Sequence, residues 1–514
     1  MAYDDGVPRG VTGDSPGADV PVPWILGAAS EDELAGKAEL LAEHLTAHPE
    51  LDPLDVGYSL AVHRTPERHR AAILGTRRED FQRGLAALAA GDLAPGVLRG
   101  IADAPGKAAF VYPGMGAQWA GMAVELLEQS PEFHRHLASL DELHAPIAGW
   151  SMLEVLRGED PGWLERIDVV QPILFATAVA LTELWRSLGV RPDSVVGHSI
   201  GELAAGCISG VYSREDAMRA ALEWGQAQHR LYGTGKVAVA QGGRDLLMDP
   251  PHPWSVWFGG MNGAQSVLLS GEWDAMDACL AHLRETGVRV NEANGVHLPA
   301  HSPMIDAIYP EMRENFGRIA ASDPGIPMFS ALQGRRLESG EVDREFYCRV
   351  LRLPVRFDEA VRAAAEADHR FFVEIGPHPL LVAAIDQTAP GADVVGSIQR
   401  GDAGLHKMLS GLCELYVRGL DVDWSAMFAG RGGQFVELPR DARIRTPRRT
   451  HQAHQGQEKA MLDLVREQVS SVLGLEKQID VRVSFSDLGL DSLTAVELRN
   501  RLVGVLGVSL PVTM

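Results

Sequence analysis

The sequence is poor in cysteine, in basic charge and in long apolar runs, and each shortage excludes a class of protein. Four cysteines occur in 514 residues, far apart and without a CxxC pair. They predict no metal site and no disulfide framework, and they favour a reducing, cytoplasmic setting. A formal net charge of −22 argues against a nucleic-acid partner and against a membrane partner. No apolar run looks long enough to cross a bilayer, and residues 1–22 lack the apolar core of a signal peptide.

The length of 514 residues predicts roughly three or four domains at ~100–200 residues each, and alternating strand and helix patterns suggest where they begin and end. The apolar strand "AAFVY" at 108–112 predicts a parallel sheet covered on both faces. We expect an α/β fold in which an α/β-hydrolase-like large subdomain carries a small ferredoxin-like insert. The expected bounds are a flexible tail at 1–22, a small α/β linker domain at 23–105, the large subdomain at 106–235 and 297–400, the insert at 236–296, a second linker at 401–455 and a partial helical segment at 456–514.

The most informative stretch is "DSVVGHSIGELAAG" at 193–206. A strand–Gly-x-Ser-x-Gly–helix turn lifts a serine hydroxyl above the sheet and sets a helix N-terminus beneath the developing negative charge. The pattern therefore predicts Ser199 as a nucleophile. Because glycine is frequent, at 54 residues of 514, the alternative is an ordinary serine at a strand–helix junction.

A serine nucleophile needs a base to take its proton, and three histidines are candidates. His198 lies inside the turn, where we expect it to pack or to line the pocket. His301, in "HLPAHSP", lies where the chain re-enters the large subdomain, and His378, in "GPHPLL", competes with it. No acidic residue can be assigned as a third member of a triad.

The motifs "FVYPGMGAQWAGM", "VVQPILFA", "GHSIGELAAG", "MNGAQSVLLSG", "PAHSPMID", "LPVRFDEAV" and "FVEIGPHPLL" follow one another along the chain. Their order resembles the acyltransferase domain of modular type I polyketide synthases, a relative of the malonyl-CoA:acyl-carrier-protein transacylases. The resemblance covers residues 106–400. The upstream stretch "PWILGAASEDELAGKAELLAEHL" resembles the small linker domain that precedes such acyltransferases.

The resemblance implies that Ser199 carries the acyl group and that His301 is the general base. It implies backbone N–H groups of Met115 and Ile200 as oxyanion donors, although Met115 replaces the glutamine of the family's P-G-Q-G loop. In the family a main-chain carbonyl near the "PVRF" stretch holds the histidine, which points to the neighbourhood of Arg356. The substrate-binding positions implied by the resemblance are Trp224, Gln118, His198, Asn262, Pro299 and Arg356.

Trp224 is the most telling departure from the family. Members that accept malonyl or methylmalonyl units carry an arginine there, which pairs with the free carboxylate of the substrate. An indole cannot form that bidentate pair, and an unpaired buried carboxylate is costly, so Trp224 favours an acyl chain that ends in hydrocarbon. The alternative is that Trp224 is only a core residue. Arg219 and Arg230 fall out of register with the family's arginine.

Three further features favour a monocarboxylic starter or a loading position. "LPAH" at 298–301 matches neither the Y-A-S-H nor the H-A-F-H pattern of extender-type members. Tryptophan at the arginine position is a feature of loading acyltransferases that take short starters from CoA. No ketosynthase-like stretch precedes the acyltransferase, which also favours a loading position.

The stretch "FSDLGLDSLTAVELRNRL" resembles the attachment site of acyl carrier proteins, with 4′-phosphopantetheine carried on Ser492. The alternative is a plain helix cap, for which Asp491 and Ser492 are both suited. Carrier domains are small helical bundles near the lower size limit for a self-sufficient core. Since the sequence ends at Met514, soon after the second long helix, we expect an incomplete carrier segment that is poorly ordered or rests on the acyltransferase.

The sequence thus predicts a loading acyltransferase that moves a short monocarboxylic acyl group from a CoA thioester to a serine, and then to a carrier thiol. The expected partners are acyl-CoA, the carrier in cis and a downstream ketosynthase module. Three alternatives stay open: an extender acyltransferase that uses malonyl- or methylmalonyl-CoA, a thioester hydrolase, and an inactive scaffold.

Overall fold

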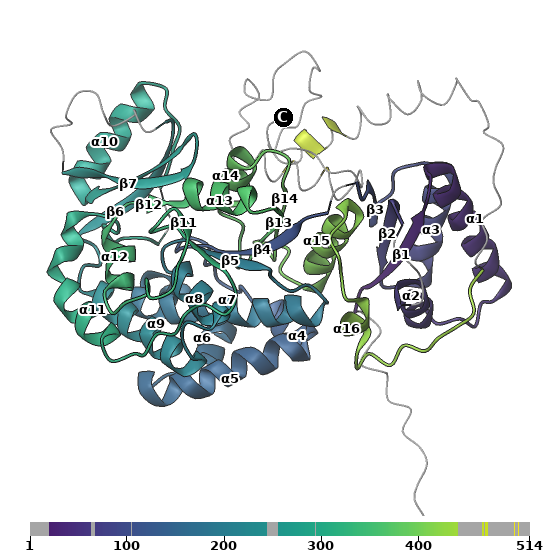
Figure 1. Cartoon of the computed structure of the whole chain (residues 1–514), viewed down its shortest axis with the longest axis horizontal. Coiled ribbons are helices and arrows are strands. Elements are labelled where there is room, and N and C mark those ends of the chain that lie inside the picture. The colour runs from purple at the N-terminus through teal and green to yellow at the C-terminus, as the bar shows by residue number, and fades with distance from the viewer. Residues whose placement is uncertain are drawn as a thin grey trace, which may run out of the picture.

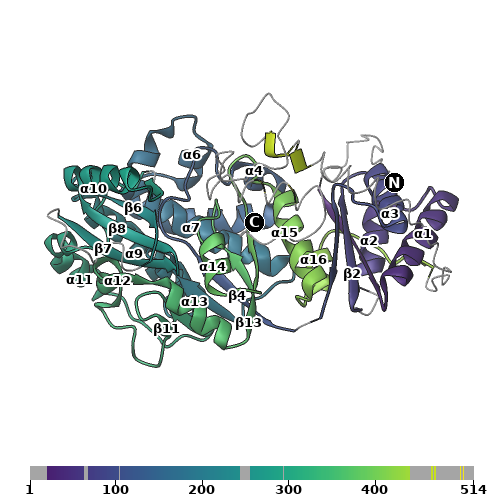
Figure 2. The same cartoon turned by 90° about the horizontal axis from the view of Figure 1, so that it is seen from above.

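Three β-sheets lie in a row along the long axis of the molecule, with helices packed on and between them (Figures 1 and 2). The structure is a computed structural model. It describes residues 20–62, 67–103, 105–243, 255–292 and 295–439, together with 465, 466, 468–470, 498 and 502. The two helices expected in the carrier segment, and Ser492 between them, lie almost entirely outside the described residues.

The first sheet is antiparallel, with strand order β1-β2-β3. Its strands are β1 (Val22–Ala28), β2 (His69–Gly75) and β3 (Val97–Ile101), and its helices are α1 (Glu31–Ala47), α2 (Pro53–Val62) and α3 (Arg78–Ala90). Ser30 caps the N-terminus of α1, because its hydroxyl accepts the backbone N–H of Glu33 at 3.2 Å. Trp24 stacks on Phe81 at 4.0 Å between ring centroids and joins β1 to α3.

The central sheet has the order β11-β10-β5-β4-β13-β14. All neighbouring strands are parallel except the edge strand β11, which runs antiparallel to β10. The strands are β4 (Lys107–Tyr112), β5 (Ser194–Gly197), β10 (Met328–Ser330), β11 (Arg335–Arg336), β13 (His369–Glu374) and β14 (Asp393–Gly396). The expected apolar strand at 108–112 therefore lies in the middle of a mostly parallel sheet, as its sequence predicts.

Helices cover both faces of the central sheet, and Figures 1 and 2 show their arrangement. They are α4 (Val124–Gln129), α5 (Pro131–Ala148), α6 (Met152–Arg157), α7 (Ile167–Ser187), α8 (Gly201–Ser209), α9 (Arg214–His229), α11 (Tyr309–Phe316), α12 (Phe346–Arg352), α13 (Phe357–Glu366) and α14 (Val382–Thr388). By length and composition α7 is apolar enough to cross a membrane, contrary to the sequence expectation. Because 89% of its most apolar window is buried, α7 is a core helix here.

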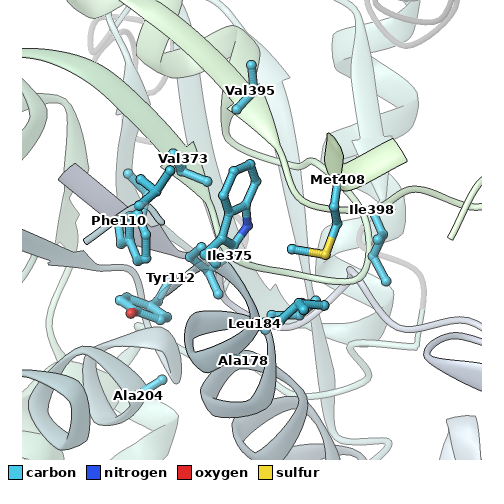
Figure 3. Packing of buried hydrophobic residues seen from close by; sticks show 14 of the residues in the cluster. Phe110, Tyr112, Ala178, Leu184, Ala204, Val373, Ile375, Val395, Ile398 and Met408 are labelled. Atoms are coloured by element: carbon cyan, nitrogen blue, oxygen red, sulfur yellow. The ribbon is translucent and has the colours of Figure 1, made fainter. Parts of the chain in front are cut away.

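Figure 3 shows the core between the central sheet and its helices. Phe110 and Tyr112 of β4 and Val373 of β13 meet Ala178 and Leu184 of α7, and all of these except Ala178 are at most 2% exposed. Side chains from the strands thus fill the space above α7. Burial of this kind contributes roughly 1.5–3 kcal/mol for each large apolar side chain.

The small sheet follows the ferredoxin-like strand order 4-1-3-2 and so confirms the predicted fold of the insert. Its elements are β6 (Gly235–Gln241), β7 (Val256–Gly263), β8 (Ser266–Glu272), α10 (Trp273–Glu285) and β9 (Val290–Glu292). The sequence did not reveal that β12 (Val355–Arg356), which comes later in the chain, extends this sheet by pairing in parallel with β7.

The described part of the segment expected as a second linker holds two helices, α15 (Leu405–Arg418) and α16 (Trp424–Phe428). In both views α15 lies between the central sheet and the first sheet (Figures 1 and 2). The Arg70 guanidinium of β2 donates to the carbonyls of Tyr416 and Leu420 at 3.0 and 3.3 Å and lies over the Tyr416 ring. These contacts hold the first sheet against α15.

We predict that Arg70→Met destabilises the packing of the first sheet on α15. The methionine keeps most of the apolar stem but removes the hydrogen bonds to the carbonyls of Tyr416 and Leu420, and also the one to the Glu67 carbonyl, a loss of about 1.5–3 kcal/mol. The measurement is thermal unfolding. Arg83→Met is the matched control, since Arg83 is exposed and pairs only across one turn with Asp80. A melting temperature that falls equally in both variants would contradict the prediction.

Candidate active site

Ser199 stands on a sharp turn between β5 and α8. Its φ is 55°, in the left-handed region that non-glycine residues rarely adopt. The flanking glycines make the turn possible. A Cβ on Gly201 would lie 2.0 Å from the Tyr112 carbonyl oxygen, and a Cβ on Gly197 would lie 2.5 Å from the Cα of Glu202. Side chains at these two positions would thus force the strand and the helix apart.

His301 approaches Ser199 from a distant part of the chain. Its Nε2 lies 3.1 Å from the Ser199 Oγ, and its Nδ1 lies 3.1 Å from the Leu353 carbonyl oxygen. A carbonyl only accepts, so Nδ1 carries the proton and Nε2 presents its lone pair to the serine hydroxyl. His301 also has a positive φ, of 60°, and its backbone N–H donates to Leu351. Two strained residues therefore face each other at one point.

Burial, with a smaller contribution from nearby His198, lowers the pKa of His301 to about 4. His301 is 4% exposed, and the protonated imidazolium would lose most of its hydration there. The ring is therefore neutral near pH 7 and ready to accept the Ser199 proton. The carbonyl of Leu353, three residues before Arg356, orients the ring where a triad would use a carboxylate.

The loop after β4 runs directly beside the serine. A Cβ on Gly114 would lie 3.2 Å from the Ser199 Cβ, so the backbone passes close enough that any side chain at position 114 would crowd Ser199. Met115 is the next residue of this loop, and Ile200 follows Ser199 at the start of α8. Both residues expected as oxyanion donors thus flank Ser199.

Met115 also takes part in a buried polar chain that the sequence did not reveal. Its Sδ accepts a hydrogen bond from Gln171 Nε2 at 2.9 Å, and the same nitrogen donates to Gln228 Oε1 at 3.2 Å. Gln228 in turn donates to the Trp224 carbonyl at 3.2 Å. Gln171 lies in the motif "VVQPILFA" on α7. That motif is the sequence feature that could have indicated a role for Gln171 near the site.

His198 connects the nucleophile turn to the small sheet. Its Nε2 lies 2.8 Å from Asn262 Oδ1, at the end of β7, and its ring meets Phe357 edge-on at 5.4 Å. Burial lowers the pKa of His198, so a neutral ring donates to the amide oxygen. The structure thus brings together His198 and Asn262, both expected near the substrate, across the two subdomains.

The other expected substrate-binding residues have identifiable contacts in the structure. Gln118 Oε1 accepts the backbone N–H of Gly116 at 2.8 Å and so orders the loop beside Ser199. Pro299 is buried and accepts the hydroxyl of Ser302 through its carbonyl at 2.7 Å. The Arg356 guanidinium pairs with Glu359 on α13, while the backbone N–H of Arg356 donates to Ala331 at 2.7 Å. Arg356 therefore links elements through its main chain.

His378, the competing base, accepts the backbone N–H of Arg400 at 3.3 Å. Among the described residues no group of three or more His, Cys, Asp or Glu could hold a metal ion.

Trp224 lies in an aromatic cluster inside the large subdomain. The indole is 1% exposed and meets Phe316 and Tyr347 edge-on, at 5.8 and 6.0 Å between ring centroids. Its Nε1 is buried without a hydrogen-bond partner among the described residues. The two other residues considered at this position lie elsewhere, since Arg219 pairs with Glu215 and Arg230 pairs with Glu311.

Comparison with known proteins gives three matches to protein families. A family described as acyl transferase domain matches residues 109–422. One described as phosphopantetheine attachment site matches residues 463–514, and one described as CurL-like, PKS C-terminal, matches residues 24–85.

Two relatives illustrate how the chain compares with longer proteins. The spectinabilin polyketide synthase system protein NorA′ of Streptomyces orinoci is 40% identical over 428 residues, which are 82% of this chain and 12% of NorA′. Protein NorC of the same system is 36% identical over an alignment of 562 positions that covers 98% of this chain and 24% of NorC. The chain thus spans a small fraction of each relative.

Two solved structures are similar over most of their own length. The acyltransferase domain from module 8 of the salinomycin polyketide synthase has a TM-score of 0.74 and 34% identity, covering 79% of this chain and 98% of that domain. A loading acyltransferase from the avermectin modular polyketide synthase has a TM-score of 0.58 and 36% identity, covering 60% of this chain and 99% of that chain.

We predict that formation of an acyl-enzyme is independent of pH between about pH 5 and 7.5. The base must be neutral to work, and His301 is neutral above its lowered pKa of about 4. The rate should therefore fall only as the pH drops toward 4. The measurement is the single-turnover rate of acylation by an acyl-CoA across this range. A rise centred on 6.5, the ordinary pKa of histidine, would contradict the buried neutral state.

Proposed function

The chain belongs to the acyl transferase domain family of modular polyketide synthases, and from this premise we propose that it is a loading acyltransferase for short monocarboxylic starters. It would take the acyl group from a CoA thioester onto Ser199. It would then pass the group to a 4′-phosphopantetheine thiol in its own carrier segment, the match at 463–514. In the synthase, the loaded carrier would deliver the starter to a ketosynthase in the cytoplasm.

The observation that carries the choice of substrate is the indole of Trp224. Its partner Tyr347 donates from its hydroxyl to the Glu202 carbonyl at 3.2 Å, on the helix that starts after Ser199. The indole is therefore one side chain away from the nucleophile's helix, in aromatic surroundings. A carboxylate that arrived there unpaired would lose hydration at a cost of several kcal/mol, whereas a hydrocarbon chain would lose nothing comparable.

Similarity alone does not choose between starter and extender. The avermectin protein is titled a loading acyltransferase and the salinomycin domain belongs to module 8, and their identities to this chain are 36% and 34%. The alternative of an extender acyltransferase that uses malonyl-type CoA is therefore the one to test. The proposal of a monocarboxylic starter over a malonyl-type extender depends on Trp224. It also depends on Arg219 and Arg230, which form ion pairs elsewhere, with Glu215 and Glu311.

The first half of the proposed reaction forms an ester. His301 Nε2 takes the Ser199 proton as Oγ attacks the thioester carbonyl. The backbone N–H groups of Met115 and Ile200 stabilise the oxyanion, and the Leu353 carbonyl holds the imidazolium through Nδ1–H. Collapse of the tetrahedral intermediate breaks the C–S bond, and the CoA thiolate leaves with the proton from His301.

The second half returns Ser199 to its free state. Ser492 would hold the 4′-phosphopantetheine, which would supply the acceptor thiol. His301 accepts the proton of that thiol as the ester on Ser199 is cleaved. Collapse expels the Ser199 alkoxide, which regains a proton from His301. One base therefore serves both halves of a ping-pong transfer.

We predict that propionyl-CoA outcompetes methylmalonyl-CoA for Ser199 by at least about tenfold, the ratio that corresponds to ~1.4 kcal/mol. The measurement is the intact mass of the protein after exposure to equal concentrations of both thioesters. Trp224→Arg should shift the ratio toward methylmalonyl, and Trp224→Phe, the apolar control, should preserve the preference for propionyl. A wild-type protein labelled mainly by methylmalonyl would contradict the proposal.

Ser199→Ala should remove all acyl labelling, because no nucleophile then faces His301 Nε2. The variant lacks one hydroxyl, and its folding can be checked by thermal unfolding. A labelled Ser199→Ala protein would show that the acyl group attaches elsewhere.

A further inference from the structure

We propose that Glu202 is a positioning residue that sets the Ser199–His301 contact, by tying the helix that follows the nucleophile to the segment that holds the base. The proposal rests on the proposed function, because it takes these two residues as the ones that perform acyl transfer. Glu202 itself touches neither the serine hydroxyl nor the imidazole in the contacts described above.

Glu202 is fully buried, at 0% exposure, although it is a carboxylic acid three residues after Ser199. One of its oxygens, Oε1, accepts the Ser330 hydroxyl at 2.7 Å and the Leu332 backbone N–H at 3.2 Å. Ser330 ends β10, the neighbour of β5 in the central sheet. Glycine at position 197 permits this approach, since a Cβ there would lie 2.5 Å from Glu202 Cα and 2.9 Å from Glu202 Oε2.

The turn held by Glu202 leads on to His301 in short steps. Ala331, between the two donors to Glu202, accepts the backbone N–H of Arg356 at 2.7 Å. Arg356 ends β12, and three residues earlier the Leu353 carbonyl accepts Nδ1–H of His301. Glu202 is thus connected to His301 through the 330–332 turn and the 353–356 segment. His301 Nε2 in turn contacts Ser199, three residues before Glu202.

The two hydrogen bonds to Glu202 Oε1 need a hydrogen-bond acceptor at that position, and they do not need the side chain to be negatively charged. Its second oxygen, Oε2, is buried without a hydrogen-bond partner among the described residues, and burial raises the pKa of Glu202 to about 8. The side chain is therefore a neutral acid near pH 7, and glutamine would present the same Oε1 acceptor. Alanine would leave a buried hydroxyl and a buried N–H without an acceptor, and the 330–332 turn would be free to move.

The test compares Glu202→Gln and Glu202→Ala in single-turnover acylation by propionyl-CoA. We expect Glu202→Gln to stay within about twofold of the wild-type rate constant. Glu202→Ala should lower the rate constant at saturating substrate by at least about tenfold with little change in KM, because a misplaced base slows chemistry and leaves binding intact.

Asp141 on α5 offers a matched control for general damage to the core. It is 8% exposed, and like Glu202 it accepts one hydroxyl and one backbone N–H, from Ser151 at 2.5 Å and Met152 at 2.6 Å. Asp141→Ala should lower the melting temperature as Glu202→Ala does, but leave the acylation rate constant unchanged. Equal losses of rate in the two alanine variants would overturn the proposal.

Two further variants keep the outcome decisive. If Glu202→Ala fails to fold, Ser330→Ala removes one donor while keeping the acid, and it should slow acylation about threefold, the effect of one hydrogen bond of ~0.7 kcal/mol. An unchanged rate in Ser330→Ala, or in a folded Glu202→Ala, would overturn the proposal.

Ser199→Ala distinguishes the proposed function from the role of Glu202. If Ser199→Ala still becomes acylated, the proposed function fails. If it is inert while Glu202→Ala is fully active, only the role of Glu202 fails.

Discussion

The contact between Ser199 Oγ and His301 Nε2, at 3.1 Å, is the interaction on which the rest of the account depends. Both residues sit in the left-handed backbone region, so neither position is one that the chain would adopt without support. The support comes from glycines that let β5 and α8 approach, and from the Leu353 carbonyl that fixes the imidazole. The Leu353 carbonyl carries no charge, so it orients the buried imidazole through Nδ1–H without favouring the protonated form as strongly as a carboxylate would.

The architecture explains how residues far apart in sequence reach this point. Ser199, the proposed nucleophile, stands at the carboxyl end of the parallel strand β5 in the central sheet, where α/β folds present their functional residues. The strand β12 leaves the large subdomain to pair with β7 of the small sheet, and the His198–Asn262 hydrogen bond crosses the same junction. The two subdomains therefore share the elements that flank Ser199.

Much of this arrangement could be predicted from sequence, because local patterns determine it. The turn around Ser199 carries its own glycines, and the alternation of strands and helices gave the mostly parallel central sheet and the ferredoxin-like insert. Other features depend on tertiary contacts without a local pattern. Examples are the two-residue strand β12, the thioether of Met115 as acceptor for Gln171, and the burial of Glu202. A glutamate on a helix is ordinarily exposed, so its burial becomes visible only with the fold.

We propose that an apolar acyl site lies beside Ser199, whose base His301 is oriented by a main-chain carbonyl. The most direct test is a crystal structure of the protein after reaction with a short monocarboxylic acyl-CoA. The account predicts an ester on Ser199 Oγ, with its carbonyl oxygen facing the backbone N–H groups of Met115 and Ile200 and its hydrocarbon chain directed toward Trp224. An acyl group on another residue, or an ester whose chain points away from the indole, would contradict it.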